Sequence, residues 1–567
     1  MKRKLFRKVL VANRGEIAIR VMRACHELGI STVAVYSDAD RNAIHTRYAG
    51  EAIHIGGAAP AESYLDLDRI MKAAQDSGAE AIHPGYGFLS ERPAFPEACA
   101  AAGIAFIGPT ASAMHLLGDK LGARELARRN GVPTTPGTGA IDDPTVARRA
   151  ALEIGLPVII KPSGGGGGIG MKVVEKEEDL VPAIESAANA ARSAFGDATV
   201  YLEKYVRSPR HVEIQVIGDQ HGNVVHLGER ECSIQRRHQK ILEESPSPAV
   251  TPDIRRRMGE AAVAACRAAA YQNAGTVEFI FSEGEFYFLE VNARLQVEHP
   301  VTEYVTGIDL VKEQIKVAAG QRLSFEQDEI TFSGHAIEMR INAENPARNF
   351  MPNPRKIQRW VAPAGPGVRV DSGYGPGSEV PSNYDSLVAK LIVHGADRAE
   401  AIARAQRALR EFVLVGPATT IPYHRAILAS PDFRSGRLTT NFISDHPELL
   451  VEMARFEVRS RRWITPRSTR ARSRPPPPPS QRCRVNERTA LPAGRQPAAG
   501  HASSLRAAGG RRRLAGWHRA ELRGARAARR RRDRLPDRGP EHVPGPPVAP
   551  FLERGGVGAA GRDAGGW

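Results

Sequence analysis

The sequence predicts a multidomain α/β protein, and three observations support this. A strand, a helix and a second strand follow one another near the start of the chain. Five consecutive glycines lie between two further apolar strands, and an acidic hairpin follows later. The chain has 567 residues, of which 42% are hydrophobic and 25% are charged. A chain of this length can bury roughly two to four domain cores, which excludes a single small binding module.

The composition also argues against membrane and disulfide-rich classes. No run of about eighteen apolar residues occurs, so a membrane-spanning helix is not expected. The basic start, residues 1–8, leads straight into a strand and lacks the apolar core of a secretory signal. No Cys-x-x-Cys pair occurs among Cys25, Cys99, Cys232, Cys266 and Cys483. We therefore expect a cytoplasmic protein with reduced thiols and no membrane partner.

The excess positive charge is confined to the last fifth of the chain. The net charge is +16, but residues 451–567 alone hold 27 Arg, no Lys and 9 acidic residues, a net charge of +18. Residues 1–450 contain 14 Lys and carry a net charge of −2. The body of the protein is therefore electrically ordinary, and we expect no nucleic-acid partner for it.

The basic segment differs from the body in other ways. It contains the runs 475–479 of proline and 529–532 of arginine, and apolar periodicity is nearly absent. Three interpretations stay open: an arginine-rich arm that binds nucleic acid or an acidic partner, a disordered tail, and translation out of frame. Out-of-frame translation of a GC-rich gene yields Arg, Ala, Gly and Pro with almost no Lys, so we favour it. Resequencing the gene across the junction tests this hypothesis, and an intact frame would refute it.

The first hundred residues predict a βαβ unit and a parallel sheet. Strand 9–12 is followed by apolar residues at helical spacing up to residue 28, then by Gly29 and strand 32–36. The turn 13–16 is not a Gly-x-Gly-x-x-Gly loop, so a dinucleotide site is not supported. Residues 81–91 place two glycines, a proline and two aromatic residues at a strand end. Such a loop at the carboxyl edge of an α/β sheet commonly faces a ligand, although a plain structural turn is the alternative.

The five glycines, Gly164 to Gly168, indicate a phosphate-binding loop between strands 157–161 and 171–174. Packing does not explain them, because adjacent glycines bury nothing and lose much entropy on folding. Their backbone amides could approach phosphate oxygens, and the loop could open and close. No Gly-Lys-Ser/Thr leads into a helix, so this is not a Walker A loop. Lys161 could neutralise a phosphate; a flexible linker is the alternative interpretation.

The next motif is an acidic hairpin, predicted by strands 276–281 and 285–292 with a turn at Gly284. Glu278 and Glu290 are then direct cross-strand partners, and Asn292 lies on the same face. Two like charges in this arrangement are destabilising unless a cation lies between them. Three oxygen ligands completed by nucleotide phosphates suit a magnesium site, whereas two solvated carboxylates on an open sheet face are the alternative.

Two charged stretches near the hairpin suit a small anion. Strand alternation would place Arg294, Gln296 and Glu298 on the face of the acidic pair, with Glu298 available as a base. Residues 229–240 are dense with charge. They could be an ordinary surface helix, or, beside a nucleotide site, they could supply His238 and Lys240 for anions.

Taken together, these motifs closely resemble biotin carboxylase, the ATP-grasp component of acetyl-CoA, propionyl-CoA and pyruvate carboxylases. The resemblance covers residues 5 to about 445. The matching segments are residues 12–18, 83–91, the five-glycine loop, 210–215, 231–240, 296–302 and 340–344. So many long matches in the right order make the resemblance specific.

The resemblance implies an α/β fold with three domains and a tail. An N-terminal Rossmann-like (pre-ATP-grasp) domain would span residues 1–117. An ATP-grasp domain would span 118–330, with a mobile glycine-rich lid at about 133–206. An α+β biotin carboxylase C-terminal domain would span 331–446, and the disordered or out-of-frame tail would span 447–567.

The resemblance also implies a carbon–nitrogen ligase with two steps. Bicarbonate attacks the γ-phosphate of ATP to give carboxyphosphate, and its carbon dioxide is captured by the ureido nitrogen of biotin. Magnesium or manganese would accompany ATP. The residues implied to bind ATP are Lys120, Lys161, Gly167, Gly168, Glu203, Lys204, Tyr205, Val206, His211, His238 and Glu278. Those implied to hold the metals are Glu278, Glu290 and Asn292, in agreement with the hairpin.

Further residues are implied in the carboxylation itself. Lys240, Arg294 and the Val297 backbone would bind bicarbonate, and Glu298 would deprotonate it. Arg340 would stabilise the biotin enolate, and Tyr86 would lie near the biotin pocket. Physically, this chemistry needs positioning and charge neutralisation more than a protein nucleophile, and the residue types fit.

The chain departs from the family pattern at three positions. Ile169 stands where the glycine loop usually has a basic residue, Arg355 where glycine is common, and Asn345 where aspartate is common. None of these removes a catalytic group.

No Ala-Met-Lys-Met-like biotin attachment sequence occurs in the 567 residues. The resemblance therefore implies a separate biotin carboxyl carrier protein, or a fused carrier domain lost with the reading frame. It also implies carboxyltransferase partners and a homodimer. Acetyl-CoA, propionyl-CoA, pyruvate and other acceptors stay open. Two other functions also stay open: another ATP-grasp ligase, such as a carbamoyl-phosphate-type enzyme, and a nucleic-acid-binding protein acting through the basic tail.

Overall fold

The computed structural model describes residues 4–141, 143–164 and 170–464. Gly167, Gly168 and Ile169 lie outside the described residues, as does the predicted tail from residue 465 onward. Among the described residues, no helix combines the length and the apolar character needed to cross a membrane.

The N-terminal part is a parallel five-stranded sheet in the order β3-β2-β1-β4-β5. Its strands are β1 (Lys8–Val11), β2 (Ser31–Ser37), β3 (Glu51–Gly56), β4 (Ala81–His83) and β5 (Ala105–Phe106). Its helices are α1 (Gly15–Glu27), α2 (Ile44–Tyr48), α3 (Leu67–Ser77), α4 (Ala94–Ala101) and α5 (Ala111–Gly118). Val9 and Val11 pack with α1 while Leu10 packs in a separate cluster with α3, so β1 is buried on both faces. The predicted βαβ unit is confirmed.

A small antiparallel sheet in the order β7-β6-β8 follows. Its strands are β6 (Val158–Pro162), β7 (Lys172–Val174) and β8 (Val200–Lys204), and α7 (Pro144–Ile154) and α8 (Leu180–Phe195) pack on it. The predicted arrangement of strand, glycine loop and strand is confirmed for the strands, because β6 and β7 pair directly.

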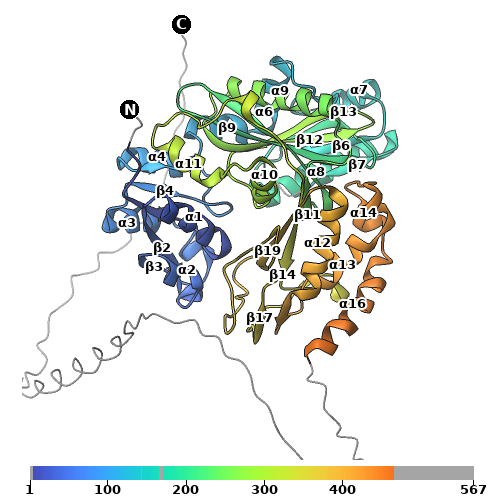
Figure 1. Cartoon of the computed structure of the whole chain (residues 1–567). Helices are drawn as coiled ribbons and strands as arrows, with labels where there is room; N and C mark the ends of the chain where they lie inside the picture. Colours follow the sequence, from blue (N-terminus) through green and yellow to red (C-terminus); the bar gives the residue numbers. More distant parts are fainter. Residues whose placement is uncertain (1–3, 142, 165–169, 465–567) are drawn as a thin grey trace, which may run out of the picture. The chain divides into compact units, whose positions relative to one another are not determined.

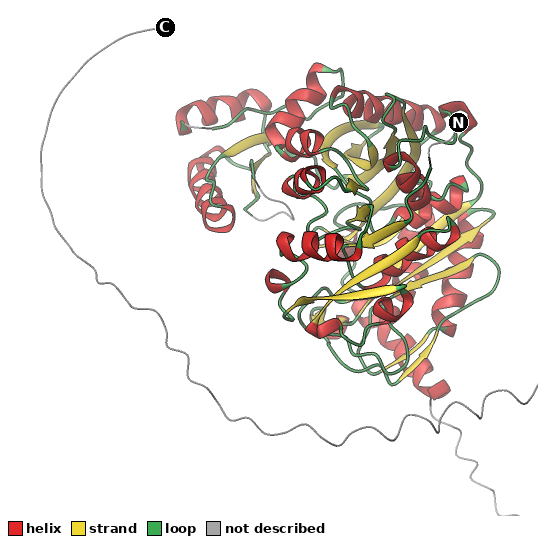
Figure 2. Cartoon of the chain, turned by 90° about the vertical axis from the view of Figure 1, so that its left-hand side faces the viewer, coloured by secondary structure: helices red, strands yellow, loops and turns green. Residues whose placement is uncertain are grey.

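The largest sheet has eight antiparallel strands in the order β13-β12-β9-β10-β11-β14-β19-β18. Its strands are β9 (Arg210–Gly218), β10 (Val224–Arg236), β11 (Gln239–Ser245), β12 (Asn273–Ser282), β13 (Glu285–Asn292), β14 (His335–Asn342), β18 (Val368–Ser372) and β19 (Leu387–Gly395). The pairing of β11 with β14 joins the middle of the chain to its C-terminal part in one sheet. Figure 2 shows the strands in yellow with helices packed along them.

Helices pack on both halves of this sheet, the half built from the middle of the chain and the half built from its C-terminal part. They are α6 (Lys120–Arg129), α9 (Pro252–Ala268), α10 (His299–Thr306) and α11 (Leu310–Ala318) in the middle of the chain. Those of the C-terminal part are α12 (Arg398–Glu411), α13 (Ile421–Ala429), α14 (Pro431–Ser435), α15 (Phe442–Asp445) and α16 (Leu449–Ile464). The remaining short strands are β15 (Glu344–Asn345), β16 (Met351–Pro352), β17 (Arg359–Val361) and β20 (Val413–Val415). In Figure 1, α12, α13 and α16 lie side by side.

The folded part extends further than the predicted tail boundary at residue 447. Helix α16 begins at Leu449, and Leu449 and Met453 are buried in the core formed with α12 and α13. The tail, expected to be disordered or out-of-frame from 447, therefore begins later than that boundary, because α16 packs into this core through Leu449 and Met453. The cause is an apolar stripe at helical spacing, which the high arginine content of the following chain obscures.

Candidate active site

A cavity of about 1140 Å³ lies where the loop after β4, the β10–β11 hairpin, the β12–β13 hairpin and β14 converge. Most of the residues implied by the sequence line it. They are Tyr86, Lys120, Lys161, His211, His238, Lys240, Glu278, Glu290, Asn292, Arg294, Val297, Glu298 and Arg340. Segments that are far apart in the sequence thus meet in one cavity, as a ligand site requires.

The other described candidates, Glu203 to Val206, are not among the residues that line this cavity. They belong to β8 and the chain just after it. Glu203 is buried, and its Oε2 accepts hydrogen bonds from Lys161 Nζ at 2.8 Å and Thr135 Oγ1 at 2.7 Å. Lys204 Nζ donates to the Gly155 carbonyl at 2.7 Å. Glu203 therefore does not line the cavity itself but holds Lys161, which does.

Backbone contacts fix the two residues after β8. The Tyr205 N–H donates to the Pro157 carbonyl at 3.1 Å, and both Tyr205 and Val206 are half-buried. This short stretch is therefore tied to the segment that leads into β6.

The acidic hairpin has the predicted Glu278–Glu290 pair, but its register shifts by one residue between Glu278 and Phe279. Glu278 pairs directly with Glu290 across β12 and β13, and Asn292 pairs with Thr276. Burial and the charge of Glu278 raise the pKa of Glu290, although Lys120, 3.7 Å away, opposes this. The Asn292 amide nitrogen is buried without a hydrogen-bond partner. Lys240 and Lys120 each approach one of the two facing carboxylates, and the remaining carboxylate oxygens form an oxygen-donor pair that fits a divalent cation.

Lys240 is the cation at the centre of the cavity. Its Nζ contacts Glu213 and lies 2.9 Å from Glu278 Oε1 and 2.8 Å from Glu298 Oε1. Burial alone would lower the pKa of Lys240, but the three carboxylates raise it well above its usual value. Lys240 therefore stays charged although it is buried.

Residues 229–240 are a strand pair rather than a surface helix. They form β10 and the start of β11, with Arg237 and His238 at the turn in the left-handed region at φ 49° and 64°. The helix interpretation is therefore wrong. The turn brings Lys240 back onto the face that carries Glu213 and Glu278.

Glu298 and Arg340 form the second half of the charged cluster. Arg340 Nη2 lies 2.8 Å from Glu298 Oε2, and Arg340 Nε donates to Glu243 Oε1 at 2.6 Å. Burial would raise the pKa of Glu298, but Lys240, Arg340 and Arg230 hold it well below its usual range. Burial raises the pKa of Glu243 to about 7 despite Arg340.

Strand alternation does not carry Arg294 and Glu298 into the cavity. Strand β13 ends at Asn292, and the following residues run without strand pairing into α10, of which Glu298 is the N-cap. Arg294 nevertheless binds Asn292 Oδ1 at 2.9 Å and Glu91 Oε2 at 2.9 Å. The predicted residues meet, but an irregular turn brings them together.

Arg230 is a residue to which the sequence assigned no role. It is fully buried, and its guanidinium group donates hydrogen bonds to five side chains. Its partners are Glu213 Oε1 at 2.5 Å, Gln215 Oε1 at 2.6 Å, Gln296 Oε1 at 2.8 Å, Thr302 Oγ1 at 3.0 Å and Thr276 Oγ1 at 3.1 Å. Gln296 in turn donates to Glu278 Oε1 at 2.9 Å. Arg230 thus holds in place residues that line the cavity. In the sequence, the indication of this role was its position in the charge-dense stretch 229–240.

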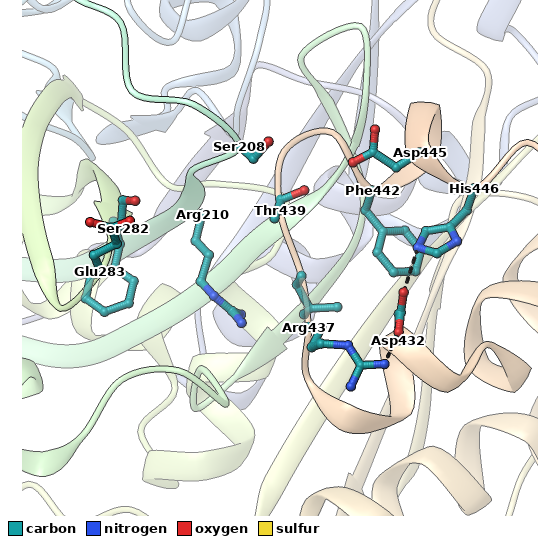
Figure 3. A pocket seen from close by; sticks show the side chains of 12 residues that line it. Ser208, Arg210, Ser282, Glu283, Asp432, Arg437, Thr439, Phe442, Asp445 and His446 are labelled. Atoms are coloured by element: carbon teal, nitrogen blue, oxygen red, sulfur yellow. Dashed lines mark hydrogen bonds and ion pairs between the residues drawn. The ribbon is translucent and has the colours of Figure 1, made fainter.

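A second cavity of about 460 Å³ lies between the start of β9, the β12–β13 turn and α14–α15 (Figure 3). Several of its charged groups pair with one another or with the backbone. Asp432 bridges Arg437 and His446, and Arg210 donates to the Gly436 carbonyl at 2.6 Å. None of its described lining residues has a buried polar atom without a partner. This cavity therefore lacks the unpaired groups that mark a ligand site.

Three family models match the chain in order. They are the biotin carboxylase N-terminal domain over residues 5–114, the carbamoyl-phosphate synthase L chain ATP-binding domain over 119–326, and the biotin carboxylase C-terminal domain over 338–445.

Two curated relatives match most of the chain. Biotin carboxylase 1 of Bacillus subtilis is 53% identical over 445 residues, covering 78% of this chain and 99% of the relative. The biotin carboxylase of Nostoc sp. is 52% identical over 442 residues, covering 78% and 99%.

Solved structures agree. The biotin carboxylase domain dimer of Hydrogenobacter thermophilus 2-oxoglutarate carboxylase, in complex with MgADP, ADP and bicarbonate, has a TM-score of 0.76 and 48% identity, covering 79% of this chain and 99% of that one. A biotin carboxylase complex from Campylobacter jejuni has a TM-score of 0.76 and 47% identity, covering 78% and 99%. With the cavity described above, these similarities show that the chain belongs to the biotin carboxylase family.

Proposed function

We propose that this chain catalyses the ATP-dependent carboxylation of biotin by bicarbonate, forming a carbon–nitrogen bond. The observation that carries this proposal is the ionised carboxylate of Glu298, held between Lys240 and Arg340 in the same cavity as the Glu278–Glu290 pair. Such a reaction needs a base, cationic side chains that bind an anion, and a pair of carboxylates that binds a metal cation.

On the ATP side, Lys120 and Lys161 would neutralise phosphate oxygens. Lys161 is held by Glu203 at 2.8 Å, so its ammonium group is already oriented toward the cavity before ATP binds. Lys204, Tyr205, Val206, His211 and His238 would complete the nucleotide site, together with Gly167 and Gly168. Glu278, Glu290 and Asn292 would hold Mg²⁺, which when bound neutralises the charge that develops on the phosphates.

On the bicarbonate side, Lys240, Arg294 and the Val297 N–H would bind the anion, and Glu298 would accept its proton. The bicarbonate oxygen then attacks the γ-phosphorus, ADP leaves, and carboxyphosphate forms. The cavity residues hold the reactants in line and neutralise charge, and no side chain becomes covalently modified.

Carboxyphosphate then breaks into carbon dioxide and phosphate, the phosphate takes the proton of a biotin ureido nitrogen, and that nitrogen attacks the carbon dioxide. Arg340 would stabilise the negative charge on the ureido oxygen, and Tyr86 would line the biotin pocket. Arg340 suits this role because Glu243 and Glu298 hold its guanidinium group from two sides. Biotin would arrive on a separate carrier protein, with carboxyltransferase partners and a homodimeric assembly. The dimer of the biotin carboxylase domain of 2-oxoglutarate carboxylase supports the homodimeric assembly.

Phosphate release from MgATP by the full chain tests this function. We expect release to require bicarbonate and to rise when free biotin is added. Release that ignores bicarbonate, in soluble protein with the expected circular dichroism spectrum, would contradict the proposal and favour another ATP-grasp ligase.

A further inference from the structure

Lys390 is a fully buried cation to which the proposed chemistry gives no role. It lies in β19, directly opposite Arg340 on β14 and Asp371 on β18. Its Nζ donates to the Val297 carbonyl at 2.9 Å and lies 3.2 Å from Glu16 Oε1. A buried ammonium group is costly unless it is paired and hydrogen-bonded, so these contacts determine where it can lie.

The hydrogen bond from Lys390 to the Val297 carbonyl fixes the plane of the Val297–Glu298 peptide, next to the proposed base, Glu298. Because a trans peptide is planar, holding the Val297 carbonyl sets the direction of the Glu298 N–H on its opposite side. Glu298 follows directly and begins α10 as its N-cap. Lys390 therefore orients the backbone from which the Glu298 side chain projects.

The preceding peptide is held in the same way. His299 Nδ1 lies 2.8 Å from the Gln296 carbonyl, and since a carbonyl only accepts, this nitrogen carries the hydrogen. Burial and the nearby charges of Lys390, Arg20 and Arg369 lower the pKa of His299 well below its usual value, so the ring is neutral. The Gln296 carbonyl thus points to His299, and the Val297 N–H points the opposite way.

Lys390 also links this segment to the loop that carries Tyr86. The Tyr86 hydroxyl donates to Glu16 Oε1, the oxygen that Lys390 contacts, and Lys390 Nζ lies 5.9 Å from the centre of the Tyr86 ring. Glu16 belongs to the first turn of α1, far from Val297 in sequence. One ammonium group therefore joins two walls of the cavity.

We propose that Lys390 is a positioning residue, which holds the Val297–Glu298 peptide beside the Tyr86 loop while His299 holds the preceding peptide, so that the Val297 N–H and the Glu298 carboxylate meet bicarbonate together. This inference rests on the proposed function and deepens it. Lys390 touches no reactant in this account. It acts through Val297, Glu298 and Glu16.

The test compares Lys390→Met and Lys390→Arg with wild type in bicarbonate-dependent phosphate release, with KM measured separately for bicarbonate and for ATP. We expect kcat/KM for bicarbonate to fall about 100-fold in Lys390→Met, the size of effect that a displacement of about 1 Å can cause. The KM for ATP should stay within about twofold of the wild-type value. Lys390→Arg keeps the charge and should fold, yet its different shape should still raise the KM for bicarbonate.

Arg255→Met is the matched control. Arg255 is a largely buried cation paired with the fully buried Glu229 at 2.6 Å, and it does not line the cavity. Its loss should lower Tm as the loss of Lys390 does, with no selective change in the KM for bicarbonate.

The outcomes separate this inference from the proposed function. If wild type shows no bicarbonate dependence, the function itself fails. If wild type shows it and Lys390→Met keeps the wild-type kcat/KM for bicarbonate, only the positioning role fails. Equal losses in both KM values would mean that Lys390 is merely structural. If Lys390→Met does not fold, Lys390→Arg decides.

Discussion

Lys240 Nζ lies 2.8 Å from Glu298 Oε1, so the central cation of the cavity directly contacts the proposed base. This contact helps to keep Glu298 ionised in spite of burial, with a pKa well below its usual range. A carboxylate held so firmly is a weak base. We therefore expect bicarbonate to draw Lys240 toward itself on binding, which would raise the basicity of Glu298 when its proton acceptor is needed.

The pKa of Glu243 predicts a loss of stability as pH rises. Burial raises this pKa to about 7, whereas the unfolded chain releases the proton near 4.3. The stabilising effect of the proton is therefore full below about pH 4.3 and is lost as pH rises through 7, a change of roughly 4 kcal/mol. Glu298, with its lowered pKa, contributes in the opposite direction but only below about pH 4.3.

Urea unfolding of wild type and Glu243→Gln from pH 5 to 8 measures this effect. We expect the free energy of unfolding of wild type to decline more steeply with pH than that of the variant. Parallel pH profiles would contradict the raised pKa.

Glu290→Gln should stabilise the ligand-free protein, because Glu290 faces Glu278 directly and like charges across a strand pair are destabilising. We expect a gain of up to about 1 kcal/mol without metal. In MgADP the order should reverse, because the wild type gains more from ligand binding. Thermal unfolding with and without MgADP checks both signs.

Glu285→Gln is the control for this prediction. Glu285 begins the same strand, is 62% exposed and lies 3.6 Å from Arg257. Its loss should leave the MgADP-dependent rise in Tm unchanged. If MgADP raises the Tm of Glu290→Gln by as much as it raises that of wild type, Glu290 is not a metal ligand.

Arg230→Met should destabilise the protein by roughly 3–5 kcal/mol, because it leaves the fully buried Glu213 with one cation fewer and four neutral groups without their donor. Arg256→Met removes an exposed arginine that pairs with Asp253 and Glu260, and should cost far less, because exposed ion pairs contribute little to stability. Denaturant unfolding measures both. Equal losses of unfolding free energy in the two variants would show that the buried hydrogen bonds of Arg230 stabilise the protein no more than the exposed ion pairs of Arg256.

Gly373→Ala should be strongly destabilising for a steric reason. A Cβ at residue 373 would lie 2.5 Å from the backbone of Gly15, at the start of α1. Either β18 or α1 must move, at a cost of about 1–3 kcal/mol. Gly375→Ala would meet only Ile44 Cδ1, at 3.4 Å, and should be tolerated. Similar Tm values for the two variants would contradict the tight contact.

The Glu278–Glu290 pairing was predicted from strand alternation about Gly284, and the structure has this pairing. The turn alone does not produce it, because Ser282 pairs with Glu285 and Phe279 with Phe288, and a register shift between Glu278 and Phe279 brings Glu278 opposite Glu290. The same alternation failed after Asn292, where the strand ends and an irregular turn carries Arg294 and Glu298 into the cavity.

The roles of Arg230 and Lys390 could not be predicted from local patterns. Arg230 binds groups on β9, β12 and α10, and Lys390 binds Glu16 and Val297. Those partners come together only when the large sheet and the N-terminal sheet are both in place. Charge density in residues 229–240 left an exposed helix open as an interpretation, because it does not reveal that the opposite charges lie on neighbouring strands.

Formation of carboxybiotin from labelled bicarbonate tests the central claim most directly. The full chain, MgATP and free biotin should give labelled carboxybiotin together with ADP and phosphate. Glu298→Gln should reduce the rate by roughly 10²–10⁴-fold, as expected for loss of a general base. If the wild-type chain forms no carboxybiotin, or if Glu298→Gln forms it at the wild-type rate, the cavity does not work as described.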